Sequence, residues 1–289
     1  MTPTLNGMIL AAGAGFTFAL LNLNLRVLAS ELPPFQVQFL RYGAGLVVMI
    51  PWIIQAGLAA YVPRALGGQL WRGVAHTAAL FFWFSALPHI PFATLTAIGF
   101  TGPIFIMLGA VLFLKERMFW QRWAAALLGF LGVLVVVAPS FTGTGGHHAL
   151  LMLASAPLFA ASFLIAKALT RHDTPQVIVA WQSLTVAVFT LPVAVWLWEW
   201  PSLVQWGIVL LCGALGSLGH WMLTMAYRIA DISAAQPVKF LDLIWAACLG
   251  YLAFSEIPTT TTLAGAAVIF LSTSWIARVE ARRGRSTPA

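Results

Sequence analysis

ATLTAIGFTGPIFIMLGAVLFLKE, residues 93–116, aligns without a gap with SAAQPVKFLDLIWAACLGYLAFSE, residues 233–256, at an offset of 140. The two segments share a pattern of apolar runs and helix breakers rather than many identical residues, and each ends on a glutamate. A second pair of segments, 34–42 and 175–183, aligns at an offset of 141. A hydropathy repeat inside an apolar chain indicates a membrane protein built from two structural repeats that meet at a shared site.

The composition places the chain in a lipid bilayer. Of its 289 residues, 61% are hydrophobic and only 8% are charged, whereas about 25% of the residues of a soluble domain carry charge. The net charge of +7 raises the question of nucleic acid. However, the basic residues lie mostly in short loops and the C-terminal tail, where membrane topology needs them, so we expect no nucleic-acid partner.

Breakers and charges divide the chain into ten apolar segments, each long enough to cross a bilayer as a helix. The polar stretch 139–147 separates the halves. We therefore expect an all-α polytopic fold with a first five-helix repeat at 1–138, a second at 148–278 and a charged cytoplasmic tail at 279–289, disordered from Glu280 onward. The expected spans are 6–29, 34–55, 69–87, 91–114, 119–138, 148–170, 175–198, 202–227, 233–254 and 260–278.

The distribution of lysine and arginine predicts the orientation. With the N-terminus in the cytoplasm, twelve of the 15 basic residues fall on the cytoplasmic side, and only Arg26 falls on the outer side. Because cytoplasmic loops are enriched in Lys and Arg, both termini are predicted to be cytoplasmic. Each half holds an odd number of spans, so the second half enters the membrane upside down relative to the first. The repeats are therefore predicted to be inverted.

The ordered set of segments resembles the drug/metabolite transporter superfamily in its ten-span EamA-type branch, and within it the YddG-type aromatic amino acid exporters. The resemblance covers about residues 7–278. It implies that the first four helices of each half enclose a central cavity, with the fifth more peripheral. It also implies export of small metabolites across a bacterial inner membrane by alternating access. The segments that carry the resemblance are 34–45, 84–105, 114–116, 226–237 and 255–256.

Three ionisable residues, Arg41, Lys239 and Asp242, are expected to lie well inside spans. A charge at the bilayer centre costs about 2.5 to 3.5 kcal/mol on insertion scales, so each should face protein or water. Lys239 and Asp242 are three residues apart on one helix face and can pair. Two interpretations stay open: a packing salt bridge with Arg41 reaching outward, or a role in a cavity or its gating. The set offers both charge signs, as the carboxylate and ammonium of an amino acid would need.

Neutral polar and aromatic side chains complete the candidate substrate-binding or gating set. His76 and His220 could carry protons, because imidazole titrates near neutral pH, or could simply pack. Amide and phenol groups inside lipid need hydrogen-bond partners, so they either join helices or bind substrate. Tryptophans could wall an aromatic pocket or pack elsewhere. The further candidates are Gln38, Tyr42, Trp83, Trp181, Gln182, Tyr227 and Trp245.

Proline and glycine break the fourth span of each half, where interruptions at corresponding places indicate a site or hinge. The hinge candidates are Gly99, Gly102, Pro103 and Pro237. Glu116 and Glu256 lie at span ends and are expected to cap or anchor loops. Gln182 aligns with Arg41, so the repeats have diverged and the site need not be symmetric. Adjacent His147 and His148 are too few for a metal site, and no metal or cofactor is expected.

The sequence carries no enzyme signature and no P-loop at a suitable position. The first hypothesis is an exporter of small metabolites, most simply amino acids and in particular aromatic ones, working from a cavity between inverted repeats; a monomer is compatible with it, and proton coupling is an option. The alternative within transport is a nucleotide-sugar or drug carrier, for which Arg41 and Lys239 make a sparse cationic set. An intramembrane lipid-modifying enzyme or a structural membrane subunit would be a different class; the enzyme would need more than one deep carboxylate.

Overall fold

A computed structural model describes residues 2–86, 89, 98–117, 119–137, 146–254 and 260–286. Every regular element in these ranges is a helix. The elements are α1 (Pro3–Ala29), α2 (Pro34–Ala56), the 3₁₀ turn η1 (Leu58–Tyr61), α3 (Leu66–Ala86), α5 (Gly102–Leu114), α6 (Trp120–Val137), α7 (Gly146–Leu169), α8 (Pro175–Trp196), α9 (Leu203–Ile229), α10 (Ile232–Ala235), the 3₁₀ turn η3 (Pro237–Phe240), α11 (Leu241–Phe254) and α12 (Thr260–Ser286).

Each of the ten expected spans contains a helix in the described part of the chain. Seven helical segments there are long and apolar enough to cross a membrane, and α5 and α6 are shorter apolar helices. The helix α3 has 21 residues but is less apolar, because Gln69, Arg72 and His76 lie on it. All three are buried. Their partners are other helices, which allows polar residues inside a spanning segment.

Local sequence explains where several helices begin. Proline occupies the first helical position of α1, α2 and α8, where its missing N–H costs nothing and its fixed φ favours the helix. Ser202 starts α9 with a capping box: its hydroxyl accepts from the Gln205 N–H, and the Gln205 amide accepts from the Ser202 N–H. These signals place the helix starts within a few residues of the ranges expected from the sequence.

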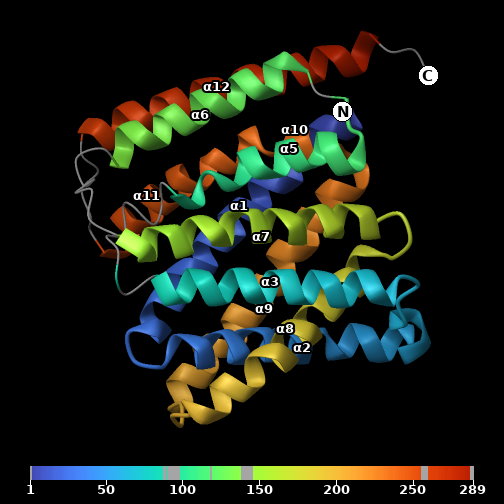
Figure 1. The fold of residues 1–289 in the computed structure, drawn as a ribbon, viewed down its shortest axis with the longest axis vertical. Coiled ribbons are helices and arrows are strands. Elements are labelled where there is room, and N and C mark those ends of the chain that lie inside the picture. Colours follow the sequence, from blue (N-terminus) through green and yellow to red (C-terminus); the bar gives the residue numbers. More distant parts are fainter. Residues whose placement is uncertain are drawn as a thin grey trace.

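The packing repeats itself across the two halves. Helix α1 of the first half packs on α9 of the second, and α3 of the first packs on α7 of the second. Exchanging the halves converts one pair into the other, as a pseudo-two-fold axis between inverted repeats requires. The pairs α2–α8 and α6–α12 map onto themselves. Figure 1 shows α6 and α12 side by side along one edge, so the fifth helix of each half is peripheral, as expected.

The start of α1, the loops after α2, α5, α7 and α9, and the end of α12 all lie at one end of the bundle, on the right in Figure 1. These loops carry Arg64, Lys115, Arg117 and Arg171, and Arg228 lies in the last turn of α9. We call it the basic end. The arrangement is the one that the predicted topology needs, and its assignment to the cytoplasm stays a prediction.

The end of the chain differs from the expectation of a disordered tail from Glu280 onward. Helix α12 continues to Ser286, and Glu280 is only 4% exposed. The reason is an ion pair between Glu280 and Arg122 of α6, at 2.9 Å, together with a hydrogen bond from Arg283 to Gln121. These contacts hold the helix on α6 past the end of its apolar run.

Helices α2 and α9 approach each other to backbone contact. A Cβ atom added to Gly213 would lie 2.6 Å from both the Ala44 carbonyl carbon and the Gly45 nitrogen. No side chain fits there, so this glycine allows α2, which carries Arg41, to lie directly against α9, which carries His220.

Candidate functional site

Four helices each place one polar side chain around His76, which lies on α3. The Tyr42 hydroxyl lies 2.8 Å from His76 Nε2, and the Gln182 amide nitrogen lies 3.3 Å from the same atom. On the other side of the ring, His76 Nδ1 lies 3.1 Å from Ser162 Oγ. The His220 ring stands 5.8 Å from the His76 ring, edge to face. We call these five residues the central histidine cluster. Four of them are sequence candidates, and Ser162 is new.

Aromatic rings surround the central histidine cluster. Phe18 meets the edge of His220 at 5.0 Å, and Phe159 meets His76 at 5.3 Å. Phe163 lies 6.3 Å from both His76 and the candidate Tyr227. Edge-to-face packing is one of the two arrangements that aromatic pairs prefer. The phenylalanines of α7 were not among the expected wall residues, because nothing in their local sequence separates them from lipid-facing aromatics.

Arg41 is buried beside this cluster rather than reaching outward. Its side chain is 8% exposed, its Nη1 donates to Gln38 Oε1 at 3.3 Å, and its guanidinium lies 4.5 Å from the centre of the Tyr42 ring. A Cβ on Gly216 would lie 3.2 Å from Arg41 Nε. The candidates Gln38, Arg41 and Tyr42 therefore form one contiguous group on α2, in which Arg41 lies against α9 and Tyr42 contacts His76 of α3.

Lys239 and Asp242 form the ion pair that their spacing predicts, at 2.7 Å, with side chains 20% and 25% exposed. A Cβ on Gly15 would lie 1.9 Å from Asp242 Oδ1, so the carboxylate rests directly on α1. Lys239 Nζ lies 5.4 Å from the centre of the Phe18 ring, which also contacts His220. The ion pair is thus joined to the central histidine cluster through one phenylalanine.

Arg72 corrects the expectation that only Arg41, Lys239 and Asp242 are charges well inside spans. It lies on α3, is 1% exposed, and donates to the Ile178 carbonyl at 2.9 Å and to Gln182 Oε1. Because Gln182 also contacts His76, Arg72 holds the cluster from the basic end. Its spacing of four residues from His76 places both on one helix face, which is the signal that could have revealed it.

The three candidate tryptophans lie outside the central histidine cluster. Trp181 Nε1 donates to the Tyr61 carbonyl at 2.8 Å and so anchors η1. Trp83 packs edge-on against Phe84 at 4.7 Å, and Trp245 packs on Phe16 at 5.6 Å. None of these three contacts involves His76 or His220, so the tryptophans do not form one wall around the cluster.

The fourth span of the second half is interrupted where the sequence expects it. Pro237 begins η3 between α10 and α11. In the first half, α5 begins at Gly102 with Pro103 in its first turn, and Gly99 comes just before. The residues 90–97 that precede this break lie outside the described residues, as does Glu256. A hinge role for these four positions stays a prediction.

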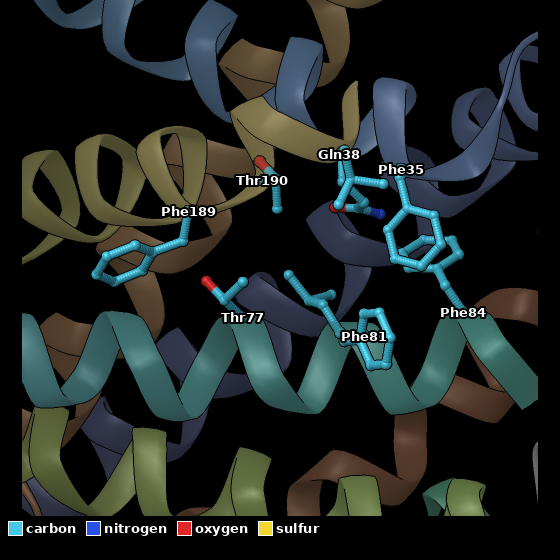
Figure 2. A pocket seen from close by; sticks show the side chains of 9 residues that line it. Phe35, Gln38, Thr77, Phe81, Phe84, Phe189 and Thr190 are labelled. Carbon is cyan, nitrogen blue, oxygen red and sulfur yellow. The ribbon is translucent and has the colours of Figure 1, made fainter. Parts of the chain in front are cut away.

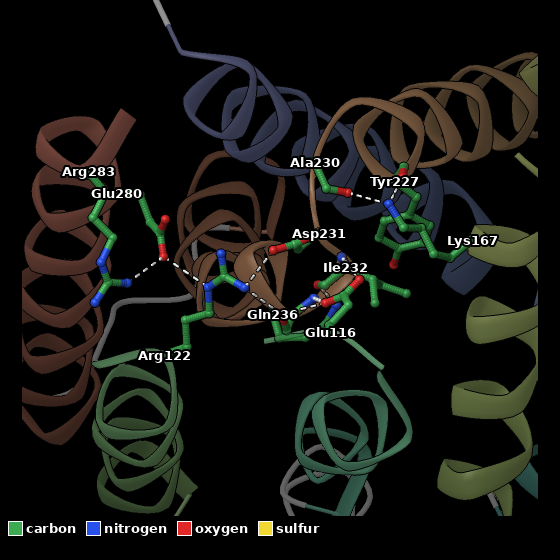
Figure 3. A network of polar contacts seen from close by, with 11 residues as sticks. Glu116, Arg122, Lys167, Tyr227, Ala230, Asp231, Ile232, Gln236, Glu280 and Arg283 are labelled. Carbon is green, nitrogen blue, oxygen red and sulfur yellow. Dashed lines mark hydrogen bonds and ion pairs between the residues drawn. The ribbon is translucent and has the colours of Figure 1, made fainter. Parts of the chain in front are cut away.

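At the basic end, Glu116 takes the capping role expected from its place at a span end (Figure 3). Its carboxylate accepts from the Ile232 N–H at 2.9 Å, the Ser233 N–H at 3.2 Å and the Ser233 hydroxyl at 2.6 Å. These are the free N–H groups at the start of α10, where a negative charge is stabilised. Lys115, just before, has a positive φ of 55° and turns the chain out of α5.

Two cations complete this group of contacts (Figure 3). Arg122 binds Glu280 at 2.9 Å, Asp231 at 3.0 Å and the Ser233 hydroxyl at 2.8 Å. Lys167 Nζ donates to the Tyr227 and Ala230 carbonyls at 2.5 and 2.7 Å, at the end of α9. We call this the basic-end latch, because it joins α6, α7, α9, α10 and α12. Its members are Glu116, Arg122, Lys167, Asp231, Ser233 and Glu280.

A mostly apolar groove lies between α2, α3 and α8 (Figure 2). Among its lining residues, Gln38 also bonds to Arg41, so one wall of the groove borders the group on α2. The enclosed space is about 40 Å³, enough for a few water molecules rather than a metabolite. The other lining residues are Phe35, Thr77, Leu80, Phe81, Phe84, Phe189, Thr190 and Val193.

Comparison with known proteins agrees with this architecture. The model of the EamA-like transporter family matches the chain twice, over residues 5–138 and 148–278. A crystal structure superposes with a TM-score of 0.80 at 21% identity, covering 97% of this chain and 98% of that chain. At this identity the likeness shows the fold alone.

Named relatives are transporters. A riboflavin transporter of Rhizobium johnstonii is 34% identical over 275 residues, covering 94% of this chain and 91% of its own. An S-adenosylmethionine uptake transporter of Rickettsia felis is 29% identical, covering 87% and 85%. A pseudopaline exporter of Pseudomonas aeruginosa is 28% identical, covering 95% and 97%. The two matching halves, the helical bundle and these relatives show that the chain belongs to the EamA-like transporter family and is a multi-pass membrane transporter rather than an enzyme.

Proposed function

We propose that this protein transports small amphipathic metabolites that carry a planar aromatic or heteroaromatic ring and a charged polar end, with aromatic amino acids as the simplest members. The observation that carries the proposal is the joining of aromatic rings and both charge signs between the two repeats. Phe18 contacts His220 of the central histidine cluster and lies beside Lys239, whose partner is Asp242. Ring faces stack on a planar solute, and the ion pair offers partners for a carboxylate and an ammonium.

The relatives widen the solute class beyond amino acids. Riboflavin and S-adenosylmethionine both combine a fused heteroaromatic ring with a polar portion, which is the chemistry that this arrangement of side chains would recognise. We propose export as the direction, in keeping with the sequence resemblance. One relative is an exporter and another is an uptake transporter, so the experiment has to measure both directions.

Proton coupling forms part of the proposal. His76 and His220 are the candidate carriers, since histidine ordinarily titrates near neutral pH. The groups that face His76 are Tyr42, Gln182 and Ser162, with His220 itself at 5.8 Å. In such a carrier, the hydrogen-bond partners of His76 would change when one repeat rocks against the other.

The test is flux in proteoliposomes with purified protein. Labelled tryptophan, phenylalanine, alanine, riboflavin, S-adenosylmethionine and a nucleotide sugar are each loaded inside or supplied outside, with and without a pH gradient. We expect saturable flux of ring-bearing solutes, weak flux of alanine, and a dependence on the pH gradient for the transported solutes. Flux confined to the nucleotide sugar would overturn the solute class, and flux indifferent to the gradient would overturn proton coupling.

Asp242→Asn is expected to reduce the flux of a zwitterionic solute by about tenfold or more, because a hydrogen bond to a charged group is worth about 1.5–3 kcal/mol. The ion pair is partly exposed and confined to one helix turn, so the melting temperature should change little. Lys239→Ala should behave in the same way. The measurement is initial flux at matched protein density, with thermal unfolding in detergent measured in parallel.

The charge-matched control is Glu31→Gln, whose carboxylate accepts from Gln205 in an exposed loop contact at 2.6 Å. It should transport normally. Full flux in both Asp242→Asn and Lys239→Ala would show that the pair only packs the helices.

A further inference from the structure

Arg41 is a buried guanidinium without an acidic partner among the described residues. Its side chain is 8% exposed, and its polar contact is to the neutral Gln38. The Arg41 Nε atom is buried and makes no hydrogen bond. An isolated buried cation is costly, and proteins ordinarily neutralise it with a nearby negative group. The charge on Arg41 therefore calls for a partner that does not come from the described side chains.

A small cavity lies directly against this guanidinium, between α2, α8 and α9. Its space is about 10 Å³, close to what one water-sized particle needs. The cavity exists because its walls include glycines of α2 and α9, and Gly216 lets the guanidinium lie against α9. None of the lining residues carries a carboxylate. The residues that the argument uses are Arg41, Gly45, Ser183, Gly216, Ser217 and His220.

Several side chains that line this cavity can still donate a hydrogen bond. Within the described part of the chain, the Ser183 hydroxyl and the His220 imidazole make no hydrogen bond, and Arg41 Nε is unsatisfied. The Ser217 hydroxyl already donates to the Gly45 carbonyl at 3.2 Å. Donors drawn from α2, α8 and α9 thus converge on one small space beside a positive charge.

We propose that this cavity binds a compact monovalent anion, in contact with Arg41 and hydrogen-bonded by Ser183 and His220. The size admits a single atom such as chloride, or the carboxylate end of a larger molecule. The anion would neutralise Arg41 where α2 packs on α9 and so stabilise the contact between the repeats. This inference is independent of the proposed solute class, because the donors, the cavity and the buried charge stand without it.

The experiment measures thermal unfolding of the purified protein in detergent. Sodium chloride replaces the sodium salt of a bulky sulfonate, which carries no carboxylate, at constant ionic strength, and a parallel series uses sodium formate. We expect a saturable rise in melting temperature in chloride that Arg41→Gln abolishes and Ser183→Ala weakens. Arg171→Gln, which removes an exposed loop charge, is the matched control and should keep the full response. A crystal soaked in bromide should show an anomalous peak beside Arg41.

The two arms distinguish the source of the anion. A response to chloride and not to formate assigns the cavity to an inorganic anion, and a response to formate assigns it to a carboxylate; both support an anion site. The same melting temperature in all three salts would overturn the proposal. An unchanged rise in melting temperature of Arg41→Gln in chloride would also overturn it. If Arg41→Gln does not fold, an unchanged rise in Ser183→Ala would have the same meaning. Transport measured in the bulky sulfonate salt, where the cavity receives neither chloride nor a carboxylate from the buffer, tests the solute class separately.

Discussion

Arg122→Met is expected to lower the free energy of unfolding by about 3–5 kcal/mol, the usual cost of removing one partner from a buried ion pair. The Arg122 and Glu280 side chains are 3% and 4% exposed, so the substitution leaves the Glu280 carboxylate buried beside an apolar group, with Arg283 Nη1 at the longer distance of 3.6 Å. The Asp231 side chain is 47% exposed and can turn to water. The loss should therefore come mainly from Glu280.

The measurement is chemical or thermal unfolding in detergent at fixed protein and lipid content. The double variant Arg122→Met with Glu280→Leu should recover much of the loss, because an apolar pair can replace a buried ion pair at little cost. Arg278→Met serves as the matched control, because Arg278 lies on α12 like Glu280 but is exposed. This substitution should change stability little. If the double variant is as unstable as the single one, the buried carboxylate is not the cause.

Gly213→Ala is expected to destabilise the protein by about 1–3 kcal/mol, the range for overpacking a close contact. The added Cβ would lie 2.6 Å from two backbone atoms of α2. A backbone cannot rotate away as a flexible side chain can, so the two helices must separate. Because Arg41 faces α9 from this part of α2, transport should fall together with stability.

Gly207→Ala on the same helix is the control for this substitution. Nothing lies within 4 Å of the added atom at position 207, and alanine is a better helix former than glycine by about 1 kcal/mol. We expect Gly207→Ala to be neutral or stabilising in the same unfolding assay. Equal melting temperatures for the two variants would mean that α2 and α9 do not meet as closely as described.

Features that depend on neighbouring residues were predictable from the sequence. The spans follow from apolar runs bounded by proline, glycine and charge, and the helices begin close to those boundaries. The Lys239–Asp242 pair follows from a three-residue spacing within one helix, and capping by Glu116 follows from its place at the end of a span. Local helix geometry places Lys239 and Asp242 on one face. The free backbone groups at a helix end likewise need a capping partner nearby.

Features that depend on packing between distant segments were not predictable. His76 and His220 were each candidates from the sequence, yet only the assembled bundle brings their rings to 5.8 Å from each other. Arg122 was expected only to lie on the cytoplasmic side, near the start of the span 119–138, and its pairing with Glu280 joins residues 158 positions apart. No hydropathy pattern encodes such a distance. The sequence likewise favoured amino acids over other solutes, whereas the relatives transport riboflavin and S-adenosylmethionine.

The symmetry of the packing has a consequence for motion. In a carrier of inverted repeats, the two access states arise when the halves exchange conformations, so contacts that map onto each other trade places. The contacts α2–α8 and α6–α12 map onto themselves and must exist in both states. We therefore predict that α2–α8 and α6–α12 act as the pivots of the motion, and that α1–α9 and α3–α7 open alternately on either side of them.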